Sequence, residues 1–220
     1  MSDNLLVVIP VYNAGRSLRY LCSELHTFIP ADIIFIDDGS SDNSQNILKE
    51  FGFHYISHPR NLGKGRALRT GMQYARKKNY DFVLTLDSDL QHPPEYIPKF
   101  LRLINKDRII IGQRSNYSNM PLHRRFSNSA TSILISIRCG ILVRDSQCGF
   151  RLYPIKLCSN HQFKEDGFQF ESEILIKGLL MGYQVQHISI PTVYGREKSS
   201  MRNIRDTIKF AAMYLRSFFW

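Results

Sequence analysis

The chain has 220 residues, which suits one domain and is enough to bury a substantial core without disulfide or metal staples. Hydrophobic residues make up 43% and charged residues 22% of it, a balance that excludes a disordered chain. The 29 lysines and arginines outnumber the 19 aspartates and glutamates, giving a net charge of +10. This excess indicates a polyanionic partner, such as nucleic acid, anionic lipid headgroups or a phosphorylated substrate.

The first half of the chain alternates short β-branched runs with segments of helical spacing. Strands are predicted over 5–9, 33–36, 54–57, 82–86 and 108–111, and helices over 16–28, 41–51, 65–78 and 94–104, with Asp42 and Ser44 as caps. Strands that alternate with helices predict right-handed βαβ units. We therefore expect an α/β fold with a mainly parallel sheet, flanked by helices on both faces.

The second half is less regular. We predict a helix over 122–137, a strand over 151–153, a helix over 169–180, a strand over 184–190 and a last helix over 203–219. No stretch reaches the roughly 18 apolar residues of a membrane span. The four cysteines show no metal-binding spacing and no secretory leader is present, so we expect free thiols and a cytoplasmic protein.

The last helix is amphipathic. Its basic stripe consists of Arg202, Arg205, Lys209 and Arg216, and the opposing apolar face of Ile204, Ile208, Ala211, Leu215 and Phe218. We expect residues 203–220 to follow a catalytic domain of residues 1–202 and to bind an anionic membrane surface as a peripheral element. The alternative is a helix packed on the domain, with its basic stripe in solvent.

Polar, turn-forming sequence follows three of the predicted strands directly. These turns are Pro10-Val11-Tyr12-Asn13, Asp37-Asp38-Gly39-Ser40 and Asp87-Ser88-Asp89. In open α/β sheets ligands bind beyond the carboxyl ends of the strands, so we expect the three turns to meet at one site. Asp87 and Asp89 can hold a hard divalent cation, Mg²⁺ or Mn²⁺, together with substrate phosphates. A solvated turn is the alternative for this pair alone, but its neighbours favour a metal site.

Other motifs have no predicted catalytic or metal-binding role. Residues 61–65 read Asn-Leu-Gly-Lys-Gly but lack the Walker spacing, so we expect a tight turn that enters a helix. His54, His58 and His92 show no ligand-like pairing and are predicted to be structural. An EF-hand is excluded, because neither the glycine nor the acidic residue that it needs follows Asp89 at the required spacing.

The motifs at 7–13, 36–42, 61–65 and 86–89 resemble, in order and spacing, family 2 glycosyltransferases with the GT-A fold, which is Rossmann-like. Downstream, Gly112-Gln113-Arg114, Arg125 with Ser129, and residues 145–151 are similar to the branch that glycosylates dolichol and polyprenol phosphates. Residues 194–199 resemble the mobile basic loop of that branch. The resemblance covers nearly the whole chain.

The resemblance implies a role for each matching residue. Pro10, Tyr12 and Asp38 would line the nucleoside pocket; Asp87, Ser88 and Asp89 would meet the metal and diphosphate, and Gln91 would complete the metal shell. Arg114, Arg125 and Ser129 would bind the acceptor phosphate, while Arg196, Lys198 and Arg202 would close over the donor. Asp89, Arg114 and Arg125 are the expected catalytic residues.

The implied reaction is an inverting transfer of a hexose from a nucleotide-sugar, of the UDP-glucose or GDP-mannose type, to a polyprenyl or dolichyl phosphate. Ala14, where many mannosyltransferases of the branch have glutamate, and Gln147-Cys148 favour the relatives that use UDP-sugars. A lipid phosphate, with a second pKa of about 6, needs no strong general base. We also consider a separate membrane-anchoring partner.

Two alternatives stay open. The first is a GT-A glycosyltransferase that acts on a saccharide or protein hydroxyl, which would need a carboxylate base such as Glu171 or Glu173. The second is a polyanion-binding module without catalytic activity. It lacks a nucleic-acid motif and leaves the acidic clusters unexplained, so we expect no nucleic-acid partner.

Overall fold

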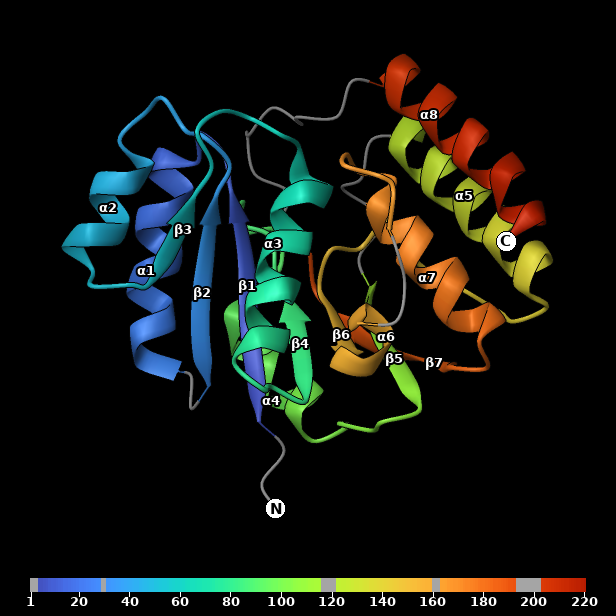
Figure 1. Ribbon diagram of the computed structural model, residues 1–220, viewed down its shortest axis with the longest axis horizontal. Helices are drawn as coiled ribbons and strands as arrows, with labels where there is room; N and C mark the ends of the chain where they lie inside the picture. The colour runs from blue at the N-terminus through green and yellow to red at the C-terminus, as the bar shows by residue number, and fades with distance from the viewer. Residues whose placement is uncertain (1–3, 29–30, 116–121, 160–162, 193–202) are drawn as a thin grey trace.

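The fold is described from a computed structural model, over residues 4–28, 31–115, 122–159, 163–192 and 203–220 (Figure 1). Within these ranges the strands are β1 (Leu5–Val11), β2 (Asp32–Asp37), β3 (Tyr55–Ser57), β4 (Phe82–Thr85), β5 (Arg108–Arg114), β6 (Arg151–Pro154) and β7 (Gln184–Ile190). The helices are α1 (Gly15–Phe28), α2 (Ser44–Glu50), α3 (Lys64–Lys77), α4 (Ile97–Leu101), α5 (Leu122–Cys139), α6 (Ile155–Ser159), α7 (Phe170–Leu180) and α8 (Asn203–Arg216). Two 3₁₀ turns, Pro94–Tyr96 and Ser217–Phe219, precede α4 and follow α8.

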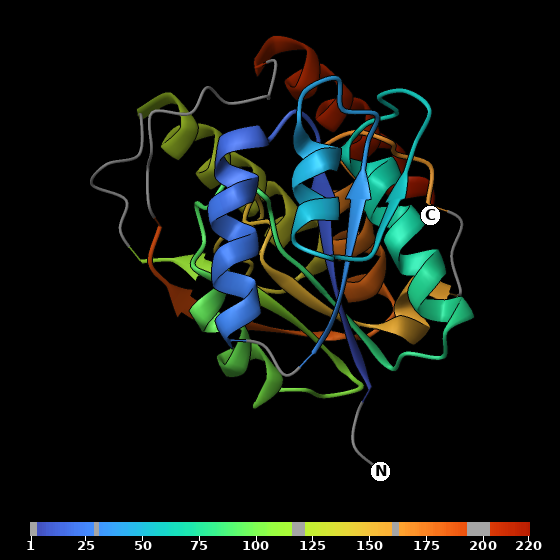
Figure 2. The same ribbon diagram turned by 90° about the vertical axis from the view of Figure 1, so that its left-hand side faces the viewer.

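The strands form a single sheet in the order β3-β2-β1-β4-β6-β5-β7. All neighbouring pairs are parallel except those that involve β6. Every residue of β1 is buried, as expected of a strand covered on both faces of a parallel sheet. Figure 2 shows α1 and α4 on one side of the sheet and α3 and α6 on the other. The predicted α/β architecture is confirmed.

The strand predicted over 151–153 is present as β6, but its antiparallel direction was not predicted. It lies between β4 and β5, and its first residue, Arg151, pairs with Thr85 at the end of β4. The Thr85 hydroxyl donates a hydrogen bond to the carbonyl of Gly149 at 2.8 Å. Because β6 runs against its neighbours, the segment before it, residues 145–150, lies at the carboxyl edge of the parallel strands.

Local contacts explain where other elements differ from the prediction. α2 begins at Ser44 instead of residue 41. Asp42 Oδ1 accepts a hydrogen bond from Ser44 N–H at 3.0 Å, whereas the Ser44 hydroxyl accepts one from Ala14 N–H at 3.1 Å. The helix predicted over 94–104 is a 3₁₀ turn followed by the short α4, and α6 was not predicted. None of the four cysteines forms a disulfide.

α8 packs beside α5 at one end of the molecule (Figure 1). The Tyr214 hydroxyl donates a hydrogen bond to the carbonyl of Leu134 at 3.0 Å, and Arg138 Nη2 donates one to the carbonyl of Ser217 at 2.6 Å. Met213 of α8 is fully buried. Residues 203–220 therefore contribute to the core. No helix in the described ranges is both long and apolar enough to cross a bilayer.

Arg151 is an interior cation that joins β6 to its surroundings. Its guanidinium is fully buried and donates hydrogen bonds to the carbonyls of Cys148 (2.6 Å), Ser146 (2.6 Å) and Glu171 (2.7 Å). A buried charge is tolerated only where its donors are satisfied, and here main-chain carbonyls satisfy them. Arg151 thus ties the segment before β6 to the first turn of α7.

We predict that Arg151→Met lowers stability by about 3 kcal/mol, because three buried carbonyls lose their donor. For a domain of this size the loss corresponds to a fall in Tm of about 6–12 °C. Thermal unfolding followed by circular dichroism measures it. The matched control is Arg19→Met, which removes the exposed Arg19–Glu50 ion pair and should leave Tm nearly unchanged. Equal Tm values for the two variants would contradict a structural role for Arg151.

Candidate active site

A pocket of about 630 Å³ opens at the carboxyl ends of β1, β2 and β4. Its described lining includes Pro10, Tyr12, Asp38, Asp87, Ser88 and Asp89, six of the residues that the sequence placed on the donor side, but not Gln91. The predicted convergence of the three polar turns is therefore confirmed. The individual role of each residue stays a prediction.

The turns after β1 and β2 are joined through Asn13. Its side-chain Oδ1 accepts hydrogen bonds from Ser41 N–H at 2.8 Å and Asp42 N–H at 3.3 Å, and its own N–H donates to the Ser40 hydroxyl at 2.9 Å. Asn13 has a φ of 49°, a conformation that asparagine tolerates better than most residues. These bonds fix the turn that presents Tyr12 at the pocket.

Asp38 anchors the next loop. Its two oxygens accept hydrogen bonds from Leu62 N–H at 3.0 Å and Gly63 N–H at 2.8 Å, and Oδ1 lies 2.7 Å from His58 Nδ1. The other ring nitrogen of His58 contacts the Thr70 hydroxyl at 2.9 Å. The prediction that His58 is structural is confirmed. Asp38 lies in the pocket as predicted, and its carboxylate orders the 61–63 loop there.

Gly63 ends this loop and lies directly before α3. Its φ is 104°, and a Cβ at this position would come within 2.4 Å of the Asp166 carbonyl oxygen. Only glycine suits a positive φ with so close a contact. The motif at 61–65 is therefore the helix-entering turn that the sequence predicted. It also directs the side chain of Lys64, the first residue of α3, into the pocket.

Lys64 bridges two carboxylates that are distant in the sequence. Its Nζ lies 2.7 Å from Asp87 Oδ1 and 2.9 Å from Glu171 Oε2. Burial alone would lower the pKa of Lys64, but the two carboxylates raise it above its ordinary value, so the side chain is an ammonium. The role of Lys64 leaves no local pattern in the sequence, because its partners lie after β4 and on α7.

Asp87 follows β4 and lies against the segment before β6. A Cβ added to Gly149 would come within 2.2 Å of Asp87 Oδ2, so only glycine allows this approach. Burial would raise the pKa of Asp87, but the charge and hydrogen bond of Lys64 hold it below its ordinary value. The Asp87 carboxylate is therefore ionised and fixed in position.

Asp89 lies on a strained turn. Its Oδ1 accepts a hydrogen bond from Gln91 N–H at 3.0 Å, and Leu90 between them has a φ of 60°. A bulky residue in this left-handed region costs about 1–2 kcal/mol. Such strain is maintained only where the surrounding structure imposes it. Asp89 is thereby turned to the same pocket as Asp87.

The carboxylate oxygens in the pocket suit a hard divalent cation, and they would fill only part of its coordination shell. The described residues contain no group of three or more His, Cys, Asp or Glu side chains gathered as a metal site. Asp87 and Asp89 nevertheless present carboxylate oxygens to the pocket, with Gln91 two residues further on. Mg²⁺ is commonly bound by one or two carboxylates, with waters and substrate phosphates as the other ligands. The residues present therefore fit Mg²⁺ or Mn²⁺.

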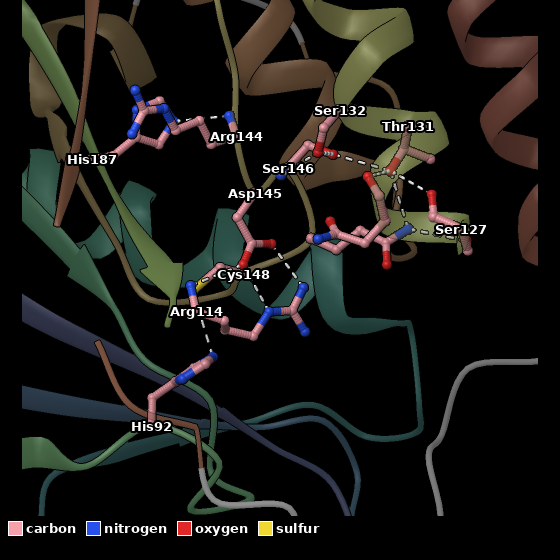
Figure 3. Close-up of polar contacts among 12 residues, drawn as sticks. His92, Arg114, Ser127, Thr131, Ser132, Arg144, Asp145, Ser146, Cys148 and His187 are labelled. Carbon is pink, nitrogen blue, oxygen red and sulfur yellow. Dashed lines mark hydrogen bonds and ion pairs between the residues drawn. The ribbon is translucent and has the colours of Figure 1, made fainter. Parts of the chain in front are cut away.

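Arg114 lies in a buried ion pair (Figure 3). Its Nε and Nη2 donate to the two carboxylate oxygens of Asp145 at 2.8 and 2.7 Å, and its main-chain N–H also donates to Asp145 at 3.1 Å. Burial would raise the pKa of Asp145, but Arg114 lowers it. The pair ties the end of β5 to the segment before β6. Arg114, the predicted ligand of the acceptor phosphate, is not part of the described lining of the pocket.

His92 is buried behind the pocket. Its Nε2 lies 3.5 Å from Cys148 Sγ (Figure 3). The centroid of its ring lies 6.3 Å from that of Phe150. Burial lowers the pKa of His92 to about 4, so its ring is neutral at pH 7. These contacts agree with the predicted structural role.

Hydroxyl groups join α5 to the same segment. The Ser146 hydroxyl donates to Thr131 Oγ1 and accepts from the Ser132 hydroxyl, both at 3.0 Å (Figure 3). This contact turns one side of α5 inward. Arg125 and Ser129, the predicted acceptor ligands on α5, are exposed and outside the described pocket lining.

α8 completes the pocket with basic residues. Arg205 and Lys209 line it together with Asp206. Both basic side chains are exposed, and they lie on one helical stripe with the buried Met213, at intervals of four residues. Our expectation that these two cations face a membrane stays a prediction, beside their place in the pocket lining. The amide of Gln169 also donates to the Asp206 carbonyl at 3.1 Å.

The two acidic residues considered as a general base are both engaged. Glu173 is buried, accepts hydrogen bonds from Lys164 N–H and Glu165 N–H, and pairs with Lys177 at 2.7 Å. Glu171 pairs with Lys64. Arg196, Lys198 and Arg202, the predicted basic loop, lie outside the described residues.

Comparison with known proteins identifies the family. Residues 6–220 match the family model "Glycosyl transferase family 2". The UDP-N-acetylglucosamine–dolichyl-phosphate N-acetylglucosaminyltransferase of Methanococcus voltae is 29% identical over 97% of this chain and 95% of its own length. The undecaprenyl-phosphate mannosyltransferase of Micrococcus luteus is 23% identical over 86% of this chain and 83% of its own.

Solved structures agree on the fold. Glucosyl-3-phosphoglycerate synthase from Mycobacterium tuberculosis, in complex with Mn²⁺, UDP-glucose and phosphoglyceric acid, superimposes with a TM-score of 0.77. It is 16% identical, and the match covers 98% of this chain and 79% of that one. The expected GT-A architecture is confirmed. With its acidic pocket at the carboxyl edge of a mainly parallel sheet, this chain belongs to glycosyltransferase family 2 and is a glycosyltransferase.

Proposed function

We propose that the chain transfers a sugar from a nucleotide-sugar donor to a polyprenyl phosphate, with a divalent cation in the donor site. One observation carries this proposal: the pocket joins the Asp87 and Asp89 carboxylates with the Arg205 and Lys209 side chains. Opposed acidic and basic groups suit a diphosphate and its counter-cation. The names of the Methanococcus voltae and Micrococcus luteus relatives support a lipid-phosphate acceptor.

The donor site is proposed from the two sides of the pocket. Pro10 and Tyr12 would contact the nucleoside, while Asp87 and Asp89 would hold Mg²⁺ or Mn²⁺. Such a cation neutralises the charge that develops on the departing nucleoside diphosphate. Arg205 and Lys209 would bind the diphosphate from α8, a charge-assisted contact that strengthens as the leaving group gains charge. Either UDP- or GDP-sugars fit this description, and Ala14 favours the UDP-sugars.

The proposed acceptor follows from the contacts that Glu171 and Glu173 already make. A saccharide or protein hydroxyl would need a general base, but Glu173 is held by two main-chain N–H groups and Lys177, and Glu171 by Lys64. A phosphate is already ionised at neutral pH and attacks the anomeric carbon without a base. This supports a phosphate acceptor, with Arg125 and Ser129 on α5 as its proposed ligands. Arg114 would act through the Asp145 pair, as a positioning residue.

A membrane site for the acceptor is supported by an exposed apolar face. It consists of Leu122, Phe126, Ile133 and Ile137 on α5, and of Ile208, Leu215, Phe218 and Phe219 on α8 and the turn after it. The two helices lie side by side (Figure 1), so these side chains belong to one end of the molecule. Large exposed apolar patches mark sites of interaction with proteins or membranes. We propose that this face enters the cytoplasmic leaflet, alone or with a separate membrane-anchoring partner.

Asp89→Asn should reduce sugar transfer by at least about a hundredfold, because the variant loses a charged ligand at the bond-breaking step. Turnover and Tm are measured together, with Mn²⁺ and with a chelator. We expect Tm to stay close to that of the wild type, since asparagine keeps the size of the Asp89 side chain in this half-buried turn at the pocket. Near-normal turnover of the variant, or a wild-type enzyme indifferent to chelation, would refute the metal assignment.

Substitutions on the two sides of α8 should affect donor binding and membrane binding separately. Replacing Arg205 and Lys209 with Gln is expected to weaken UDP-sugar binding about tenfold or more, because charged hydrogen bonds contribute about 1.5–3 kcal/mol each. Vesicle co-sedimentation of this variant should be unchanged. Calorimetry with the donor and sedimentation with anionic vesicles give the two readings.

The matched control lies on the same helix. Replacing Ile208 and Leu215, each 64% exposed, with Gln should reduce vesicle binding and leave donor affinity unchanged. If the Arg205 and Lys209 variant loses vesicle binding instead, the basic side of α8 faces the lipid, and the proposed donor contact is wrong.

A further inference from the structure

We propose that Lys64 competes with the divalent cation for Asp87, and that its ammonium turns to the donor diphosphate when the cation takes this carboxylate. The inference rests on the proposed function. It gives Lys64 a task that neither the sequence motifs nor the relatives' names assign: to set the metal affinity of the site and link metal binding to donor binding.

The geometry of Lys64 supports this role. Its Nζ is held at 2.7 Å by Asp87 and at 2.9 Å by Glu171, and 17% of its side chain is exposed, toward the pocket that it lines. The turn at Gly63 fixes the start of α3, and with it the position from which the Lys64 side chain enters the pocket. The ammonium therefore lies close to the position that a cation bound to Asp87 and Asp89 would occupy.

Sharing the Asp87 carboxylate between the ammonium and a divalent cation is unfavourable, because the two cations repel each other. The carboxylate lies against Gly149 on one side, where a Cβ would come within 2.2 Å of Oδ2, and Lys64 takes Oδ1. A divalent cation on the same carboxylate would lie within a few ångströms of the ammonium. Like charges at such a separation repel by about 4 kcal/mol per pair of unit charges at an effective dielectric of 20. This repulsion favours a movement of Lys64 away from Asp87 when a metal binds.

The charges around Lys64 allow this exchange. Asp87, Asp89 and Glu171 bring three carboxylates to this region, whereas Lys64 and the buried Arg151 bring two cations, so one negative charge is left in excess. Glu171 Oε1 is buried and has no hydrogen-bond partner among the described residues. A further cation would lower this imbalance, while Glu171 keeps hold of the lysine. The arrangement thus favours metal binding, but the metal competes with the Lys64 ammonium for Asp87.

A lysine suits such a movement better than an arginine. Its ammonium is a compact charge on a flexible four-carbon stem, whereas a guanidinium would be fixed by its planar fork. The pocket also holds the groups proposed for the diphosphate, Arg205 and Lys209, on its other side. Because Lys64 lines the same pocket, a change of its side-chain rotamer can direct the ammonium to a diphosphate bound there.

The test compares Mn²⁺ binding and nucleotide binding in Lys64→Gln. Without nucleotide, Mn²⁺ titrated by electron paramagnetic resonance should bind about tenfold or more tightly to the variant, because a neighbouring charge shifts a carboxylate's affinity for a cation by that order. With saturating Mn²⁺, calorimetry should show UDP binding about tenfold more weakly, since one charge-assisted contact is lost. A role confined to structure would not move the two affinities in opposite directions.

The matched control is Lys177→Gln. Lys177 also pairs with a buried glutamate, Glu173, at 2.7 Å and with 14% of its side chain exposed, but it is outside the described pocket lining. This variant should change Tm without changing either affinity. If Lys64→Gln does not fold, the double variant Lys64→Met with Glu171→Gln removes both charges of the buried pair and should show the same tighter Mn²⁺ binding.

The outcomes separate the two proposals. Wild-type protein that binds no Mn²⁺ even with UDP refutes the metal-dependent function. Wild-type protein that binds Mn²⁺, with a Lys64 variant that binds it equally or more weakly, overturns the inference alone. Tighter Mn²⁺ binding with weaker UDP binding in the variant supports both.

Discussion

The ion pair between Lys64 and Asp87 holds the active site together. Lys64 begins α3, Asp87 follows β4, and Glu171, the second partner of the lysine, lies on α7. Gly149, from the segment before β6, closes on Asp87 from the other side. Four elements that are distant in the sequence thus meet at one carboxylate. In a chain with a net charge of +10, two cations support this acidic edge: the half-buried Lys64 and the fully buried Arg151.

The course of β6 explains how these elements come together. A parallel strand would deliver the residues before it to the far edge of the sheet, but the antiparallel β6 delivers them to the catalytic edge. Arg151 and the Arg114–Asp145 pair then fix this segment through buried hydrogen bonds. The cost of burying these charges is offset because nearly every donor has a partner. The result is a rigid wall behind the Asp87 carboxylate.

The sequence predicted the parallel half of the sheet well, because each strand from β1 to β4 is a short apolar run that ends in a turn. The convergence of Tyr12, Asp38 and Asp87 followed from that topology. What the sequence could not predict depends on distant contacts: the direction of β6, the partners of Lys64 and the orientation of α8. Helical spacing gave the basic stripe of α8 correctly, but only packing decides which stripe faces the domain. Here the burial of Met213 sets the orientation of α8, and Arg205 lines the pocket as a result.

The central claim, that a lipid phosphate accepts the sugar, rests on a site whose candidate bases are engaged. The most direct test offers radiolabelled UDP- and GDP-sugars with Mn²⁺ to two acceptors that differ only in the phosphate, a polyprenyl phosphate and the matching polyprenol. The label is then followed into the organic phase. We predict transfer to the phosphate and none to the alcohol, because only the phosphate is ionised without a base. Transfer to the polyprenol, or to a water-soluble saccharide in place of the lipid phosphate, would contradict the account.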